Sequence, residues 1–171
     1  MTQLPVRADR LRRQARLMNV INVPMRWLLS LPFATPLSRQ LMLLTLTGRK
    51  SGKIYRQPVS FVRDSETLLT PAGGRWKLNL RAGECTRIRL AGRDQLARPQ
   101  LIRDVNEVEA LLRKMMAVNP RITSFAPVAG PQGQIDRGRV EDAVRYGFAI
   151  VRWHFDCPSA ASVARQPAGR P

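Results

Sequence analysis

Residues 42–63 read MLLTLTGRKSGKIYRQPVSFVR, and this stretch decides the fold. The apolar run 42–47 and the run 54–63, rich in β-branched and aromatic residues, predict two strands. The segment between them, 48–53, has glycine as its first and fifth residue, which favours a tight turn. The stretch therefore predicts a β-hairpin whose turn carries three cations, Arg49, Lys50 and Lys53.

The rest of the chain predicts more strands than helices. The clearest helix is residues 106–118, which contain no breaker and place apolar side chains at helical spacing. The other expected elements are a strand at 67–70 ended by Pro71-Ala72-Gly73-Gly74, a short helix at 75–81, a hairpin of 85–91 with 95–103, a loop at 120–138, a helical turn at 139–146 and a strand at 147–155. About six strands joined mainly by hairpins predict an α+β fold with an antiparallel sheet or small barrel.

The charge of the chain favours a polyanionic partner. The chain has 171 residues, 29 Lys+Arg and 12 Asp+Glu, for a net charge of +17. Residues 1–60 hold eleven Lys/Arg and one acid, so they carry +10 of this excess. A phosphorylated cofactor, nucleic acid and an anionic membrane surface all satisfy such a charge. Few aromatic residues lie near the basic hairpin, which makes nucleic acid the least favoured of the three.

The sequence divides into three parts, which are a basic helical segment at 1–33, a barrel domain at 34–157 and a disordered tail at 158–171. Residues 8–20 predict a basic amphipathic helix, followed by a short helix that ends near Pro32. This segment either packs on the domain or makes a peripheral membrane contact. The expected location is the cytoplasm, with the inner face of the membrane as the place of any such contact.

Cysteine and histidine are too few for several kinds of site. Cys85 and Cys157 stand far apart, and His154 is the one histidine, so a zinc site or a histidine-based triad is not expected. Both cysteines are predicted to be reduced, with Cys85 a small buried residue. His154 is predicted to be either a hydrogen-bonded histidine or an edge histidine rather than a catalytic one.

Several motifs, taken in order, resemble the deazaflavin-dependent nitroreductase and quinone reductase family. They are the run LTLTGRKSGK at 44–53, then Arg56, Pro58 and Val59, then Ala72-Gly73-Gly74, then Trp76 and the run NLRA at 79–82. The similarity covers residues 18–103. It implies an antiparallel split β-barrel of the FMN-binding type, a homodimer, and coenzyme F(420) as the cofactor, with FMN or FAD as the alternative.

The resemblance also implies a role for each motif. The basic hairpin would hold the phosphate and acidic tail of the cofactor through Lys50, Ser51, Lys53 and Arg56, with Pro58 close by. The backbone of Ala72, Gly73 and Gly74 would lie against the deazaflavin ring, and Trp76 and Asn79 would line the same pocket. The implied reaction is hydride transfer from the reduced deazaflavin to a quinone, an enone or a nitroaromatic compound. A proton donor, if the reaction uses one, would be Tyr146 or solvent.

Other functions stay open at this level. The chain departs from the family pattern after Gly74, where one residue, Arg75, precedes Trp76 in place of a longer loop, and Lys77 stands where an aromatic residue is common. The alternatives are a flavin- or haem-binding split barrel, or a basic module without catalysis that binds anionic membrane or nucleic acid. Trp76 and Asn79 also fit purely structural roles, as a core anchor and a turn residue.

Overall fold

The computed structural model describes residues 40–120, 122, 128–129 and 133–158. The predicted helical segment at 1–33 and all but the first residue of the predicted tail lie outside the described residues. Within the described ranges, no helix is both long enough and apolar enough to span a membrane.

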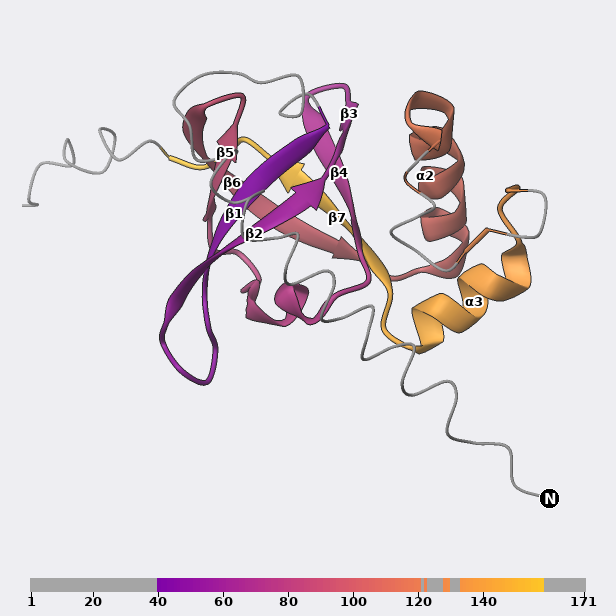
Figure 1. The fold of residues 1–171 in the computed structure, drawn as a ribbon, viewed down its shortest axis with the longest axis horizontal. Coiled ribbons are helices and arrows are strands. Elements are labelled where there is room, and N and C mark those ends of the chain that lie inside the picture. The colour runs from indigo at the N-terminus through magenta and orange to yellow at the C-terminus, as the bar shows by residue number, and fades with distance from the viewer. Residues whose placement is uncertain (1–39, 121, 123–127, 130–132, 159–171) are drawn as a thin grey trace, which may run out of the picture.

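Seven antiparallel strands form one sheet in the order β2-β1-β5-β6-β7-β4-β3. The strands are β1 Leu41–Thr47, β2 Ile54–Ser60, β3 Val62–Asp64, β4 Thr67–Ala72, β5 Thr86–Leu90, β6 Arg93–Ile102 and β7 Ala149–His154. A short 3-10 helix, η2 Arg75–Asn79, follows β4. The helices α2 Val105–Val118 and α3 Arg137–Arg145 lie together on one side of the sheet (Figure 1). This is the predicted α+β split barrel, which the structure confirms.

The sheet curls because β6 changes partner along its length. Its first half, up to Ala97, pairs with β5, and its second half, from Arg98, pairs with β7. Each half therefore has a strand on one side only. The same holds for the edge strand β2 and for β4 beyond Leu69, where β3 no longer pairs with it. Pro58, Pro71 and Pro99 all lie in such singly paired segments, where a missing backbone N–H is tolerated.

Two apolar cores lie on opposite faces of the curled sheet. Inside the curl, Met42, Leu68, Ile88 and Trp153 pack together. On the outer face, a second cluster joins β4, β6 and β7 to both helices, with Leu69, Ile102, Leu112, Val140 and Ile150 among its members. Neighbouring residues of β4 and β7 alternate between the two clusters because successive side chains of a strand point to opposite faces.

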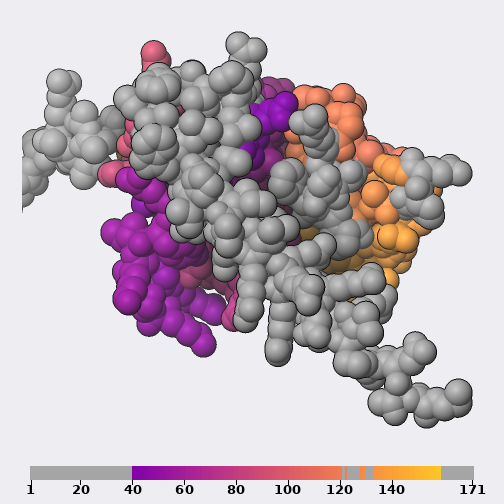
Figure 2. All heavy atoms as spheres, in the orientation of Figure 1, coloured from indigo at the N-terminus to yellow at the C-terminus, as the bar shows by residue number. Residues whose placement is uncertain are grey.

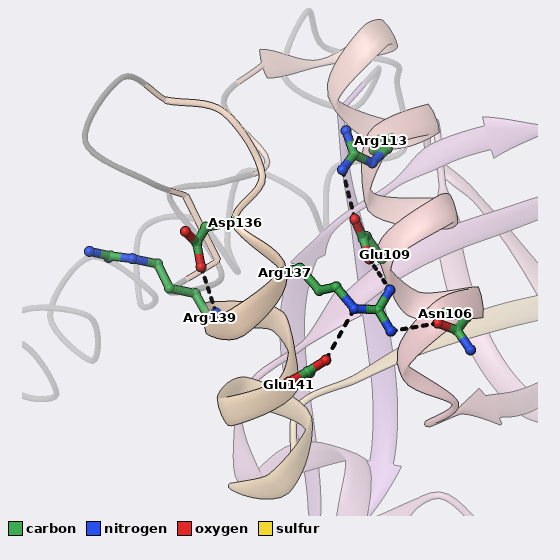
Figure 3. A network of polar contacts seen from close by, with 7 residues as sticks. All are labelled: Asn106, Glu109, Arg113, Asp136, Arg137, Arg139 and Glu141. Atoms are coloured by element: carbon green, nitrogen blue, oxygen red, sulfur yellow. Dashed lines mark hydrogen bonds and ion pairs between the residues drawn. The ribbon is translucent and has the colours of Figure 1, made fainter.

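A set of charged contacts holds α3 against α2 (Figure 3). The Arg137 guanidinium donates to Glu109 of α2 at 3.0 Å, to Asn106 at 2.9 Å and to Glu141 of its own helix at 3.1 Å. Hydrogen bonding by Arg113, followed by the charges of Arg113 and Arg137, holds the pKa of Glu109 below its ordinary value. The first turn of α3 is capped by Asp136, whose side chain accepts from the backbone N–H of Arg139 at 2.8 Å. The position of α3 on the domain is thus set by directional bonds as well as by apolar packing.

The clearest differences from the predicted element boundaries are at three places. The expected strand 54–63 is two strands, β2 and β3, separated by Phe61, which gives seven strands rather than about six. The strand 67–70 continues through Pro71 and Ala72, because β4 pairs with β7 up to Ala72, so the break begins only at Gly73. The predicted loop 120–138 ends earlier, since α3 already begins at Arg137.

The prediction of two reduced cysteines is wrong, because Cys85 and Cys157 form a disulfide. Cys85 is also exposed rather than buried. The sheet register explains the pairing. Thr86 pairs with Ala97, and His154 pairs with Arg98, so adjacent residues of β6 bring the start of β5 next to the end of β7. The cysteines lie just beyond these two ends.

Removing this disulfide should lower the stability of the domain. The cysteines are 72 residues apart, and a crosslink that closes so long a loop restricts the unfolded chain strongly. We expect the double variant Cys85→Ser/Cys157→Ser to lose about 2–4 kcal/mol of unfolding free energy in urea denaturation. Dithiothreitol should lower the midpoint of the wild type and leave that of the double variant unchanged. A wild-type midpoint that does not respond to dithiothreitol would contradict the assignment.

Candidate functional site

The hairpin turn between β1 and β2 is a closed, glycine-dependent loop. Its ends are joined by the Gly48 N–H, which donates to the Lys53 carbonyl at 2.8 Å, and by the Gly52 N–H, which donates to the Gly48 carbonyl at 2.8 Å. Gly52 has a φ of 65°, in the left-handed region that favours glycine. At position 48 a Cβ would lie 2.7 Å from Ser51 Oγ, so any side chain there would displace the hydroxyl. In Figure 2 the hairpin forms a lobe at the lower left of the molecule.

Asn79 of η2 fastens this turn to the body of the domain. Its side-chain oxygen accepts from the backbone N–H of Arg49 at 2.9 Å. Because that partner is a donor only, the amide group must face the turn with its oxygen, which leaves its nitrogen to donate to the Tyr55 hydroxyl and to the Trp76 carbonyl. Burial raises the pKa of Tyr55, so its hydroxyl stays protonated and can still donate to a ligand.

Between the turn and η2 lies a cavity of about 240 Å³, which we call the anion cavity. It is lined by Gly48, Arg49, Lys50, Ser51, Tyr55, Arg75, Leu78 and Asn79. No carboxylate lines it, and within the described part of the chain no acid pairs with any of its three cations. Unpaired cations beside two hydroxyl groups suit a phosphate or a carboxylate.

The size and composition of the anion cavity fit one part of the predicted cofactor. Small-molecule pockets usually enclose about 300–1,000 Å³, so this one has room for a phosphate and a short acidic group but not for a fused ring system as well. A tricyclic ring in the same ligand would therefore extend outside the cavity, one of whose lining residues is Arg75. The exposed backbone of Gly73 and Gly74 directly precedes that residue.

The side chains of Lys77 and Trp76 hold the Gly73-Gly74 segment in place. The buried side chain of Lys77 donates from Nζ to the Gly74 carbonyl at 3.0 Å. Burial, with a smaller contribution from the charge of Arg103, lowers the pKa of Lys77. A Cβ on Gly74 would lie 2.9 Å from Cδ1 of the Trp76 ring, so the indole packs closely against this backbone. Lys77 appeared in the sequence only as a departure from a family pattern, and its positioning role follows from the fold.

The structure brings some of the predicted site residues together and separates others. Lys50, Ser51 and Asn79 line the anion cavity. Lys53, Arg56 and Pro58 belong to the same hairpin but do not line it, and Ala72 is fully buried in the barrel interior. Gly73 and Tyr146 line a second cavity, of about 360 Å³. Trp76 is half-buried against the inner core and Gly74.

Five residues of the anion cavity were not among the predicted cofactor-binding residues. Gly48 and Arg49 had been recognised as part of the basic turn without a binding role, and the other three had no functional role. Arg75 had been read only as the remnant of a shortened loop, Leu78 had no assigned role, and Tyr55 had been assigned to the strand framework. The basic character of Arg75 was the one available signal. His154 is hydrogen-bonded, the first of its two predicted states, since its Nε2 lies 2.9 Å from Oε1 of Gln100 on the neighbouring strand, and its own strand β7 is not at an edge of the sheet.

The family of the chain follows from its sequence. The profile of the F(420)H(2)-dependent quinone reductase family matches residues 30–130, which is more than half of the 171 residues. This chain belongs to that family. It is accordingly a deazaflavin-dependent reductase with coenzyme F(420) as its cofactor, as the motifs predicted, and membership does not favour the alternative of a basic module without catalysis.

Solved structures similar to this reductase are distant in sequence. One is an F(420)-H(2)-dependent reductase, FDR-A, with 15% identity and a TM-score of 0.46, covering 68% of this chain and 95% of the other. Another is described as a domain-swapped dimer, with 14% identity and a TM-score of 0.47, covering 80% and 98%. No protein of curated function matches the sequence significantly.

Removal of the Asn79 side-chain amide should weaken cofactor binding indirectly. Its oxygen and nitrogen bond to other residues of the protein, so the amide acts by positioning the residues that line the anion cavity. We expect Asn79→Ala to raise the Kd for coenzyme F(420) about tenfold, because the variant loses the two hydrogen bonds that orient Arg49 and Tyr55, and a third that anchors the Asn79 amide to the Trp76 carbonyl. Fluorescence titration measures the affinity, and amide hydrogen exchange of residues 48–53 measures the freedom of the turn. The control is Gln95→Ala, an exposed change on β6 far from the turn. Unchanged exchange and affinity would contradict the fastening role.

Proposed function

We propose that this reductase holds the phosphate and acidic tail of coenzyme F(420) in the anion cavity and places the deazaflavin ring along Gly73 and Gly74. The observation that carries this proposal is the cavity itself, in which Arg49, Lys50 and Arg75 converge with no carboxylate among the described lining residues. A cofactor with a phosphate and a polyanionic tail matches this charge.

Each part of the site has a distinct task in this proposal. Lys50 and Arg75 bind anionic oxygen atoms by charge-assisted hydrogen bonds, and the hydroxyl groups of Ser51 and Tyr55 donate to the same atoms. Lys53 and Arg56 lie outside the cavity and contribute to the positive potential of the hairpin. Lys77 and Trp76 hold the glycine backbone so that it presents no side chain to the ring.

The chemistry then needs no nucleophile from the protein. When bound, the reduced deazaflavin supplies a hydride to an electron-poor acceptor, for which we propose a quinone. The protein contributes position and charge, and the proton comes from Tyr146 or from solvent. The homodimer that the resemblance implies stays a prediction, which sedimentation equilibrium would test, and so does the peripheral membrane contact of residues 1–33.

Titration of the purified protein with coenzyme F(420), FMN and FAD at two salt concentrations tests the proposal. Quenching of tryptophan fluorescence reports binding, because Trp76 packs against the proposed ring site. We expect micromolar binding of coenzyme F(420) that weakens at high salt, and weaker binding of the two flavins. Reduced coenzyme F(420) should then be oxidised when a quinone is added. Equal binding of all three compounds, or none, would contradict the proposed site.

A further inference from the structure

A third cavity, of about 180 Å³, lies between the end of β1, the residues that follow η2 and the start of β5, and we call it the β5 cavity. Its lining is mostly polar and includes Thr45, Thr47, Arg81, Glu84, Cys85 and Arg87. Because small-molecule pockets usually enclose about 300–1,000 Å³, this cavity suits a compact ligand.

Cys85, one half of the disulfide, forms part of the wall of the β5 cavity. Cys85 is exposed, whereas Cys157 is half-buried and is not one of the lining residues. A thiolate breaks a disulfide by attacking one of its two sulfur atoms, and access helps to decide which of them is attacked. A thiol held in this cavity therefore meets Cys85 first, and Cys157 is the leaving group.

The charges around the disulfide favour an anionic thiol. Arg87 pairs with Thr45 across β1 and β5, and both side chains lie on the face of the sheet opposite to the inner core. Among the residues that the structure describes, no acid pairs with Arg87, while Arg81 pairs with Glu84 at 3.2 Å. The lining thus holds one positive charge in excess beside hydroxyl groups. Such a set of groups suits a carboxylate.

Residues 80–85 connect the disulfide to the anion cavity. Asn79, directly before them, lines both the anion cavity and the β5 cavity and accepts from the Arg49 N–H of the turn. Within the segment, the Glu84 N–H donates to the Arg81 carbonyl at 3.3 Å, and the two side chains form the ion pair. These contacts are local, whereas the disulfide ties the segment to a residue 72 positions away. Opening the disulfide should therefore give the segment, and Asn79 with it, more conformational freedom.

We propose that the β5 cavity binds a small thiol that carries a carboxylate, and that exchange of this thiol with the disulfide controls how firmly the reductase holds its cofactor. Arg87 binds the carboxylate, and the thiolate of the ligand attacks Sγ of Cys85. A bond between the ligand sulfur and Cys85 forms as the bond to Cys157 breaks. The electron pair of the broken bond leaves with Cys157 as a thiolate, which takes a proton from solvent.

A second molecule of the thiol completes the reduction. Its thiolate attacks the ligand sulfur of the mixed disulfide and releases Cys85 as a thiolate, which is also protonated by solvent. In total, the protein disulfide and two small thiols become two cysteine thiols and one small-molecule disulfide. The effect on the cofactor rests on the proposed function, in which the anion cavity binds coenzyme F(420).

Two thiols of similar size but different charge test the binding site. The probes are 3-mercaptopropionate, which carries a carboxylate, and 2-mercaptoethanol, which is uncharged. Arg87→Gln should slow reduction of the disulfide by excess 3-mercaptopropionate about tenfold, and reduction by 2-mercaptoethanol by less than about twofold. The ratio of the wild-type rate to the variant rate cancels the intrinsic reactivity of each reagent. Mass spectrometry after alkylation of the free thiols follows the reaction.

Two further variants make this comparison specific. Glu84→Gln removes an acid from the lining and should speed reduction by 3-mercaptopropionate about threefold. Arg93→Gln removes a charge from an exposed position on β6 and should match the wild type with both reagents. When the reagent is limiting, its adduct should be found on Cys85. Equal slowing of both reagents by Arg87→Gln, no slowing of either, or an adduct on Cys157 alone would overturn the thiol site.

Hydrogen exchange and cofactor binding measure the consequence of opening the disulfide. After reduction, the amides of residues 79–86 should exchange faster, and the Kd for coenzyme F(420) should rise about threefold. Cys85→Ser/Cys157→Ser should show both properties with or without the thiol. Unchanged exchange at 79–86 would overturn the control of the cofactor site by the disulfide. Faster exchange there and in the turn 48–53, with an unchanged Kd, would instead overturn the proposed function, because the cofactor would not depend on the anion cavity.

Discussion

The triple variant Arg49→Gln/Lys50→Gln/Arg75→Gln is expected to bind coenzyme F(420) at least a hundredfold more weakly than the wild type. These side chains are the cations of the anion cavity, and a charge-assisted hydrogen bond contributes about 1.5–3 kcal/mol. Solvent screens the exposed parts of these contacts, so we expect the combined loss at the lower end, about 3 kcal/mol or more. The affinity of the wild type should fall steeply with salt, and that of the variant only weakly.

A charge-matched control separates local contacts from overall charge. Arg63→Gln/Arg93→Gln/Arg113→Gln removes the same three charges from exposed positions on β3, β6 and α2. We expect this variant to bind coenzyme F(420) within about threefold of the wild type at moderate salt, because charges beyond a Debye length of about 10 Å are largely screened. Equal losses in both triple variants would show that the net charge, and not the anion cavity, is responsible.

Trp153→Ala is expected to destabilise the domain by about 3–5 kcal/mol. Trp153 of β7 is fully buried inside the curl of the sheet, and deletion of so large a core side chain leaves a cavity that the surrounding strands cannot fill. Its indole N–H also donates to the buried Thr70 hydroxyl at 3.1 Å. Since small domains are stable by about 5–15 kcal/mol in total, much of the stability should be lost. Urea denaturation followed by circular dichroism measures the change.

Trp153→Phe divides this loss into its two parts. The variant keeps most of the apolar ring but removes the partner of the Thr70 hydroxyl, which should cost about 1–3 kcal/mol. A loss as large as that of the alanine variant would mean that the hydrogen bond dominates. A loss below about 1 kcal/mol in the alanine variant would contradict the placement of Trp153 in the inner core.

The local sequence pattern was enough to predict the elements that depend on interactions between residues close in sequence. The turn at 48–53 was predicted from its glycines, the hairpin of β5 and β6 from the turn at Gly92, and α2 to within one residue from its helical spacing. Each of these depends on interactions between residues close in sequence, such as the hydrogen bonds that close the turn between Gly48 and Lys53. The motif order also identified the family, which a profile match confirms.

The candidate site was predicted only in part, because its two halves come from different elements. The cations of the turn could be recognised in the sequence, but their meeting with Arg75 depends on Asn79, which bonds a backbone group 30 residues away. The second cavity joins Gly73 to Tyr146, which no sequence spacing relates. Lys77 received a role only when the position of the Gly74 carbonyl was known, and the close packing of Trp76 on the Gly74 backbone also became visible only in the structure.

By itself, the sequence determined the basic hairpin and the antiparallel α+β class, since residue type and local spacing carry these features. The family and the cofactor followed from the resemblance of its motifs to a known family, which the profile match confirms. Only the tertiary structure decided the strand order, the partner change along β6, the disulfide and the cavities. The physical reason is that the pairing register between strands distant in sequence cannot be deduced from local spacing. Pairing of Ala97 with Thr86 and of Arg98 with His154 brings the ends of two distant strands together, and with them two cysteines that lie 72 residues apart.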